Sequence, residues 1–188
     1  GVDVDLHWGL LREGRLRNGL AGDMLERRQQ ERGQWMLRDE DALFVLLVHS
    51  AISKHLSGWD MGLHRVTDLL AWIRDREYDW AKVRGMLEAN GVLTAAWATL
   101  RWVQLLAGEH APTNLQPILN DVRPGRARQS WIDFWLRNDL PGRTSNRRWT
   151  RLLGFSSLLH DTAGDAIRAA RGRRQAARRS KADLAAFR

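Results

Sequence analysis

The chain has 188 residues, which suits one domain or a domain with an appendage, and its formal net charge at pH 7 is +8. It contains no cysteine, which excludes disulfides and thiolate metal sites and predicts a reducing, cytoplasmic location. No apolar run reaches the ~18 residues of a membrane-spanning helix, so no membrane partner is expected.

The first element in the chain is a predicted strand over residues 2–8. Apolar residues alternate there with Asp3, Asp5 and His7, which is the period of a half-buried strand. A lone strand is unstable because its backbone groups need a neighbour. The partner is either another segment, such as Trp35–Leu37, or a sheet upstream. Since the chain opens at Gly1, we expect it to be truncated, with this strand a remnant of an α/β domain.

The rest of the pattern predicts a mainly α fold, an antiparallel helical bundle joined by short connections. A short polar helix is expected from Asp23 to Arg32, and Leu46 and Leu100 are expected in the core. The longer helices are predicted over residues 39–56 with Asp39 as N-cap, 61–76, 79–90 with Asp79 as N-cap, 92–107 and 129–137, and a last one begins at Thr144 or Ser145. The predicted domains are an α/β remnant (1–37), a helical domain (38–165) and a basic tail (166–188).

The basic tail holds eight basic residues and one acid, so it carries +7 of the net +8. Arginine and lysine can neutralise phosphates, which makes the tail a candidate for nucleic acid or an acidic partner. The candidate contacts are Arg171, Arg173, Arg174, Arg178, Arg179 and Lys181. The alternative is a solvated terminus whose arginines reflect a high-GC genome.

Ten tryptophans are present, and most stand at the spacing of a helical core, as Trp72, Trp97, Trp131 and Trp135 do. A base-stacking platform needs an exposed aromatic side chain beside arginines. Only Trp149, between Arg148 and Arg151, shows that pattern in the sequence.

Asp3, Asp5 and His7 share one face of the predicted strand. Carboxylates two residues apart on a strand point the same way, about 7 Å apart, so they can address one metal ion or one substrate. Acids on the solvent side of an edge strand give the same pattern, and spacing alone does not separate the two readings.

The segment Val4-Asp5-Leu6-His7-Trp8 resembles a motif of a bacterial family of uncharacterised nucleotidyltransferases, which are similar to the DNA polymerase β-type nucleotidyltransferases. The resemblance runs from Val2 to about Leu106. It continues through Asp41-Ala42-Leu43 to His49, Lys54-His55, Leu63 to Asp68-Leu69-Leu70, and Asp79-Trp80.

That resemblance implies transfer of a nucleoside monophosphate from a nucleoside triphosphate to an unknown acceptor, with Mg²⁺ as cofactor. Two metal-binding carboxylates of such enzymes follow a Gly-Ser turn as Asp-x-Asp, and a third lies on a later strand. Asp5 matches the third as a catalytic metal ligand, and Asp3 is a second candidate ligand. Because no Gly-Ser turn precedes an Asp-x-Asp strand here, we expect a C-terminal portion that is inactive and metal-free alone.

The resemblance also implies a cleft between the helices and the absent nucleotide-binding domain. Candidates for lining it are His7 and four polar residues on the predicted helices: His49, His55, His64 and Asp68. His64 and Asp68 stand four residues apart and could hydrogen-bond, and ordinary structural hydrogen bonding is the alternative for all four. Two other functions stay open: a non-catalytic helical module that binds nucleic acid or an acidic partner through its tail, and an adaptor that acts by protein contact.

Overall fold

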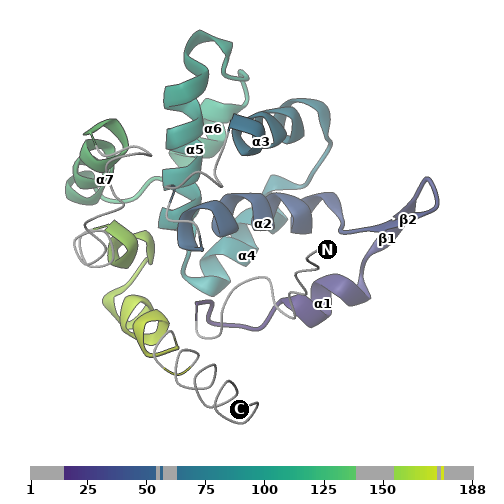
Figure 1. Ribbon diagram of the computed structural model, residues 1–188, viewed down its shortest axis with the longest axis horizontal. Coiled ribbons are helices and arrows are strands. Elements are labelled where there is room, and N and C mark those ends of the chain that lie inside the picture. Colours follow the sequence, from purple (N-terminus) through teal and green to yellow (C-terminus); the bar gives the residue numbers. More distant parts are fainter. Residues whose placement is uncertain (1–14, 54–55, 57–62, 139–154, 173–174, 176–188) are drawn as a thin grey trace, which may run out of the picture.

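The computed structural model describes residues 15–53, 56, 63–138, 155–172 and 175, and it is mainly helical, as predicted (Figure 1). The predicted strand over residues 2–8 and the helix expected to begin at Thr144 or Ser145 lie outside these ranges. The helices are α1 (Ala21–Glu26), α2 (Asp39–Ile52), α3 (Leu63–Asp75), α4 (Trp80–Asn90), α5 (Leu93–Ala107), η2 (Gly108–His110), α6 (Leu115–Asp121), α7 (Arg126–Asn138), η4 (Ser156–Leu159) and a helix over residues 163–172.

Helices α2 and α5 form the centre of the body, and α3, α4 and η4 pack against both. The run Ala42–Val48 is apolar on every side of α2, and its Phe44 and Leu47 are almost completely buried. The Thr99 hydroxyl of α5 donates to the Leu47 carbonyl over 2.7 Å, so this buried hydroxyl is satisfied. None of the helices in the described ranges is both long and apolar enough to cross a bilayer.

Replacing Leu100 by Ala should destabilise the protein by about 2–5 kcal/mol, because this side chain is fully buried in α5 and its removal leaves a cavity. Leu46 was also predicted for the core, but it is only half-buried, so Leu46→Ala should cost clearly less. Urea unfolding of both variants measures the difference. A larger loss for Leu46→Ala would contradict this assignment of the buried faces.

Helix α4 begins and ends at the residues predicted from the sequence. The Asp79 carboxylate accepts from the backbone N–H of Ala81 at 3.0 Å and of Lys82 at 3.3 Å. The hydrogen bond from the Lys82 backbone is the main cause that lowers the pKa of Asp79, so the cap is charged at neutral pH. At the other end Gly91 adopts a left-handed conformation, with φ of 67°, directly after Asn90.

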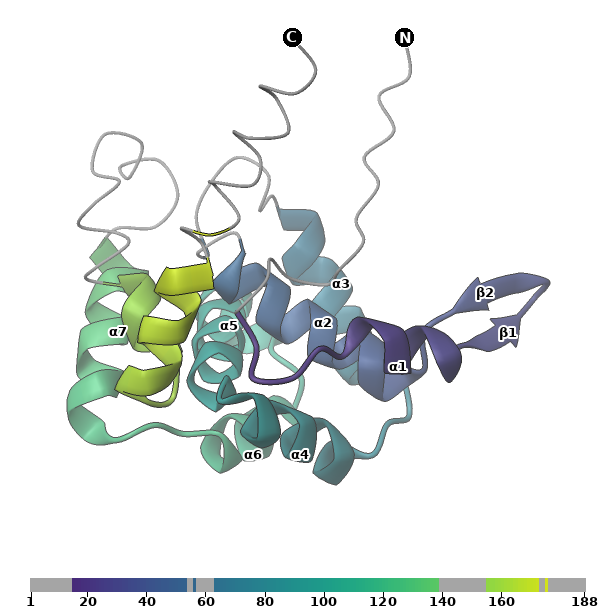
Figure 2. The same cartoon turned by 90° about the horizontal axis from the view of Figure 1, so that it is seen from below.

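The segment between α1 and α2 is a β-hairpin, and the polar helix predicted from Asp23 to Arg32 is wrong. Helix α1 stops at Glu26, and β1 (Gln29–Glu31) pairs antiparallel with β2 (Gln34–Met36). The turn residues Arg32 and Gly33 both have positive φ, 49° and 80°, the geometry whose twist matches the flanking strands. Both views show the hairpin projecting from the helical body (Figures 1 and 2).

Other helix boundaries also shift from the predicted ones. Asp39 lies in the first turn of α2, and Arg38 occupies the N-cap without a side-chain hydrogen bond. An acid within the first turn still favours the helix through its dipole, which explains why the sequence pattern placed the start within one residue. Helix α2 ends at Ile52 rather than at residue 56, and α3 ends at Asp75 rather than at residue 76.

Candidate functional site

Most of the predicted site residues lie outside the described ranges. Among them are the predicted metal ligands Asp3 and Asp5 and the cleft candidates His7 and His55. The same holds for the candidate tail contacts Arg173, Arg174, Arg178, Arg179 and Lys181. The predicted metal site and the predicted tail contacts therefore stay predictions. Arg171, the one tail candidate that is described, is exposed on the helix over residues 163–172.

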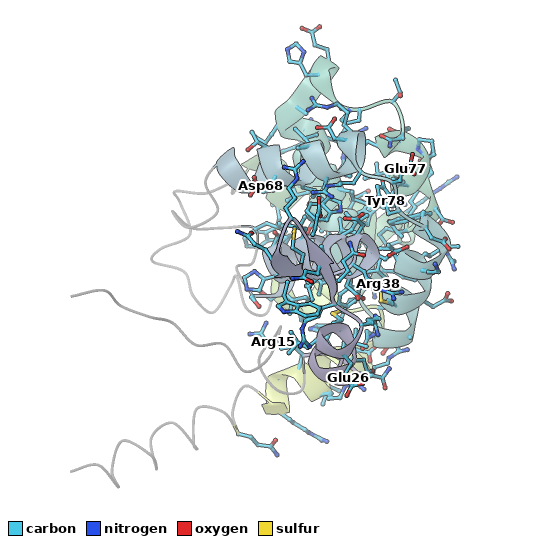
Figure 3. All side chains as sticks on the ribbon, turned by 90° about the vertical axis from the view of Figure 1, so that its right-hand side faces the viewer. Arg15, Glu26, Arg38, Asp68, Glu77 and Tyr78 are labelled. Carbon is cyan, nitrogen blue, oxygen red and sulfur yellow. The ribbon has the colours of Figure 1, made fainter. Side chains whose placement is uncertain are left out.

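The predicted cleft residues on the helices are described in part. His49 is half-buried in the last turn of α2, whereas Asp68 is exposed on α3 (Figure 3). His64 belongs to the first turn of α3, but its side chain is not among those described. No group of three or more His, Asp or Glu residues in the described part of the chain is placed to hold a metal ion.

Sequence analysis missed a buried arginine, Arg15, at the C-terminal end of α2. Its side chain is 7 % exposed, and Nη1 donates to the carbonyl of Ile52, the last residue of the helix. The C-terminal end of a helix carries partial negative charge, so a guanidinium there is favourable. Arg15 follows Asp5 by ten residues along the chain. Arg15 is therefore fixed to the end of α2.

Two neighbours of Arg15 extend this attachment to other elements. Arg17 makes a bidentate ion pair with Asp165, with Nε–Oδ1 and Nη2–Oδ2 distances of 2.9 and 2.7 Å. Asp165 belongs to the helix over residues 163–172, which we call the C-terminal helix. The backbone N–H of Asn18 donates to Oδ1 of the buried Asn90 at 3.1 Å. Residues 15–18 thus contact α2, α4 and the C-terminal helix. We call this set of contacts the 15–18 anchor.

The acidic run at the start of α2 is structural. Asp41 is 1 % exposed, and both of its oxygens accept from Arg27, at 2.6 and 2.8 Å. These hydrogen bonds raise the pKa of Arg27. Asp39 lies 3.8 Å from Arg76, and Glu40 lies 3.7 Å from Lys82. Each acid of the run faces a cation, so the Asp-x-Asp spacing of residues 39 and 41 does not provide a free pair of metal ligands.

A family model described as uncharacterised nucleotidyltransferase matches residues 1–108, more than half of the chain. The match spans the predicted strand, the 15–18 anchor, the hairpin and helices α1 to α5. Comparison with curated proteins and with solved structures gives no match.

Proposed function

The chain belongs to the family of uncharacterised nucleotidyltransferases, and we propose that it takes part in transferring a nucleoside monophosphate from a nucleoside triphosphate to an acceptor. The matched range contains the segment Val4-Asp5-Leu6-His7-Trp8, whose sequence resembles a motif of the same family. A nucleoside triphosphate is the donor that such a reaction requires. The acceptor is left open.

Asp5 is the residue we propose for catalysis, as a metal ligand with Asp3 beside it. Mg²⁺, when bound, neutralises the charge of the triphosphate and favours ionisation of the attacking hydroxyl. Hard oxygen ligands suit this ion, and two strand carboxylates provide them.

The helical body is proposed to position the strand that carries Asp5. The observation that supports this role is the 15–18 anchor, since Arg15, Arg17 and Asn18 stand within 13 residues of Asp5 and are held by three separate elements. Catalytic carboxylates must be held to a fraction of an ångström, and a hydrogen-bonded anchor that includes the buried Arg15 supplies such rigidity. His49, three residues before Ile52 on α2, is proposed to lie beside the cleft at the same helix end.

We further propose that these 188 residues do not catalyse transfer by themselves, because they contain no Gly-Ser turn followed by an Asp-x-Asp strand to hold the triphosphate. The test compares this chain with the product of the complete open reading frame. Each is incubated with Mg²⁺, α-labelled nucleoside triphosphates and cell extract as the source of acceptors. Label transfer with pyrophosphate release is expected only from the complete product. Transfer by the 188 residues alone, or by neither protein, would contradict the proposal.

A further inference from the structure

The β1–β2 hairpin carries an exposed tryptophan stacked with an arginine. Trp35 is 63 % exposed, the largest value among the exposed large hydrophobic side chains of the described residues. The guanidinium carbon of Arg28 lies 4.7 Å from the centroid of its ring. Gln30 is the direct cross-strand partner of Trp35, so both side chains stand on one face of the hairpin. The exposed indole and the guanidinium group together offer a flat aromatic face with a positive charge beside it.

Three exposed arginines stand in the hairpin and its flanks. Arg28, Arg32 and Arg38 are exposed, and in the ranges that the structure describes none lies within ion-pair distance of a carboxylate. The second arginine–tryptophan pair differs: Arg76 stacks on the half-buried Trp72, but lies 3.4 Å from Glu31 and 3.8 Å from Asp39. The hairpin therefore offers free positive charge beside a free aromatic face.

We propose that the hairpin and its flanks, residues 28–38, bind single-stranded nucleic acid, with one base stacked on Trp35 and phosphates on Arg28, Arg32 and Arg38. Stacking on an aromatic side chain combined with arginines along the backbone is how proteins hold single strands. The Gln30 amide, on the face of Trp35, can hydrogen-bond a base edge. This inference does not depend on the transfer activity.

The composition of the hairpin favours nucleic acid over a protein partner. Its exposed residues between positions 28 and 35 are glutamines, arginines, one glycine and Trp35, with no aliphatic side chain. A protein interface would pair the tryptophan with an apolar centre, whereas here the indole stacks with the guanidinium group of Arg28 and has a glutamine as its cross-strand partner. Such a surface matches the flat base and the charged backbone of a nucleotide chain.

The hairpin is also held ready for binding. It projects from the helical body in two perpendicular views, which leaves room for a strand beside it (Figures 1 and 2). Glu31, the last residue of β1 before the turn, pairs with Arg76, and at the base of the hairpin Nε of Arg38 donates to the Arg27 carbonyl over 2.9 Å. Figure 3 looks onto this side of the molecule and labels Arg38. A preformed stack reduces the entropy that binding has to overcome.

The test measures binding of a fluorescein-labelled, mixed-sequence RNA of about 12 nucleotides by fluorescence anisotropy. Trp35→Ala should weaken binding about 5- to 100-fold, and Trp35→Phe should restore much of it, because a ring is still present.

Arg28→Ala should weaken binding and lower the slope of log binding constant against log salt concentration by about 0.7, measured between about 50 and 200 mM salt. Arg74→Ala removes the same charge from α3, where Arg74 pairs with Asp75, and should leave binding unchanged. Melting curves confirm that each variant is folded.

DNA of the same sequence shows whether the hairpin distinguishes the sugar, and an RNA duplex shows whether unpaired bases are needed. Weaker binding of the duplex supports the proposal. Equal binding of duplex and single strand, or wild-type affinity in Trp35→Ala, would overturn it. A chain that ends at Gly172 tests the basic tail: if binding disappears there while Trp35→Ala binds normally, the tail is the binding site. Absence of oligonucleotide binding by the wild-type chain also overturns the proposal. The contact surface at Arg28 and Trp35 would then be one for a protein partner.

Discussion

Asp5→Asn is expected to reduce nucleotidyl transfer by the complete protein about 100-fold or more while leaving its stability nearly unchanged. The substitution keeps the size and most hydrogen bonding of the side chain, but removes the charge that holds a metal ion. Stabilisation of transition-state charge by a metal is worth several kcal/mol, and each 1.4 kcal/mol corresponds to about a factor of ten in rate. Pyrophosphate release measures the activity, and thermal unfolding measures the stability.

Asp75→Asn is the matched control for this experiment. Asp75 is an exposed carboxylate at the end of α3 whose partner is the neighbouring Arg74, so the same charge is removed away from the proposed site. Its activity should stay at the wild-type level. Full activity in Asp5→Asn would make Asp5 an ordinary surface acid. A loss of several kcal/mol of stability in that variant would instead make it a structural carboxylate paired inside the fold.

The elements that could be predicted from the sequence are those whose signals are local. Helix α4 has a capping aspartate at one end and Asn90-Gly91 at the other, and both act within a few residues of the helix that they limit. The apolar run of α2 predicts burial for the same reason, since it leaves no polar face for solvent. These elements were predicted to within a few residues.

The hairpin was missed because its local signals favour a helix. Glutamine, arginine and glutamate have good helix propensity, and Arg32-Gly33 is a weaker turn signal than Asn-Gly. Trp35 was not singled out as a stacking tryptophan for a related reason, and Trp149, which lies outside the described residues, stays a prediction. The rule that found Trp149 required arginines adjacent in sequence, whereas Arg28 reaches Trp35 across two paired strands. Trp131, predicted for the core, is 44 % exposed on α7.

The contacts that surround the candidate site are long-range, and this limits what the sequence can predict about it. Arg17 and Asp165 are 148 positions apart. Asp161 accepts from the backbone N–H groups of Leu93 and Thr94 at 3.0 and 2.8 Å and so caps α5 from 68 residues away. No periodicity in the sequence records such pairs. The family resemblance was the only signal that joined Asp5 to the helices before the structure was known.

Gly91→Ala is expected to destabilise the protein by about 2–4 kcal/mol, an unusually large cost for adding one methyl group. Two effects add. A non-glycine residue at the φ of 67° found here costs about 1–2 kcal/mol, and the added Cβ would meet Asp165 Oδ2 at 2.6 Å and Arg17 Nε at 2.8 Å. The ion pair that ties residues 15–18 to the C-terminal helix would therefore have to move.

Gly85→Ala provides the matched control, because Gly85 lies within α4 with nothing within 4 Å of an added Cβ. There the same change should stabilise the helix by about 0.5–1 kcal/mol. Urea unfolding of both variants gives the two free energies. In an Asp165→Ala background the cost of Gly91→Ala should fall toward the backbone contribution, since the carboxylate is gone and Arg17 loses the partner that holds it against Gly91. An unchanged cost in that background would show that Gly91 is required for its backbone conformation and that the 15–18 anchor tolerates the extra atom.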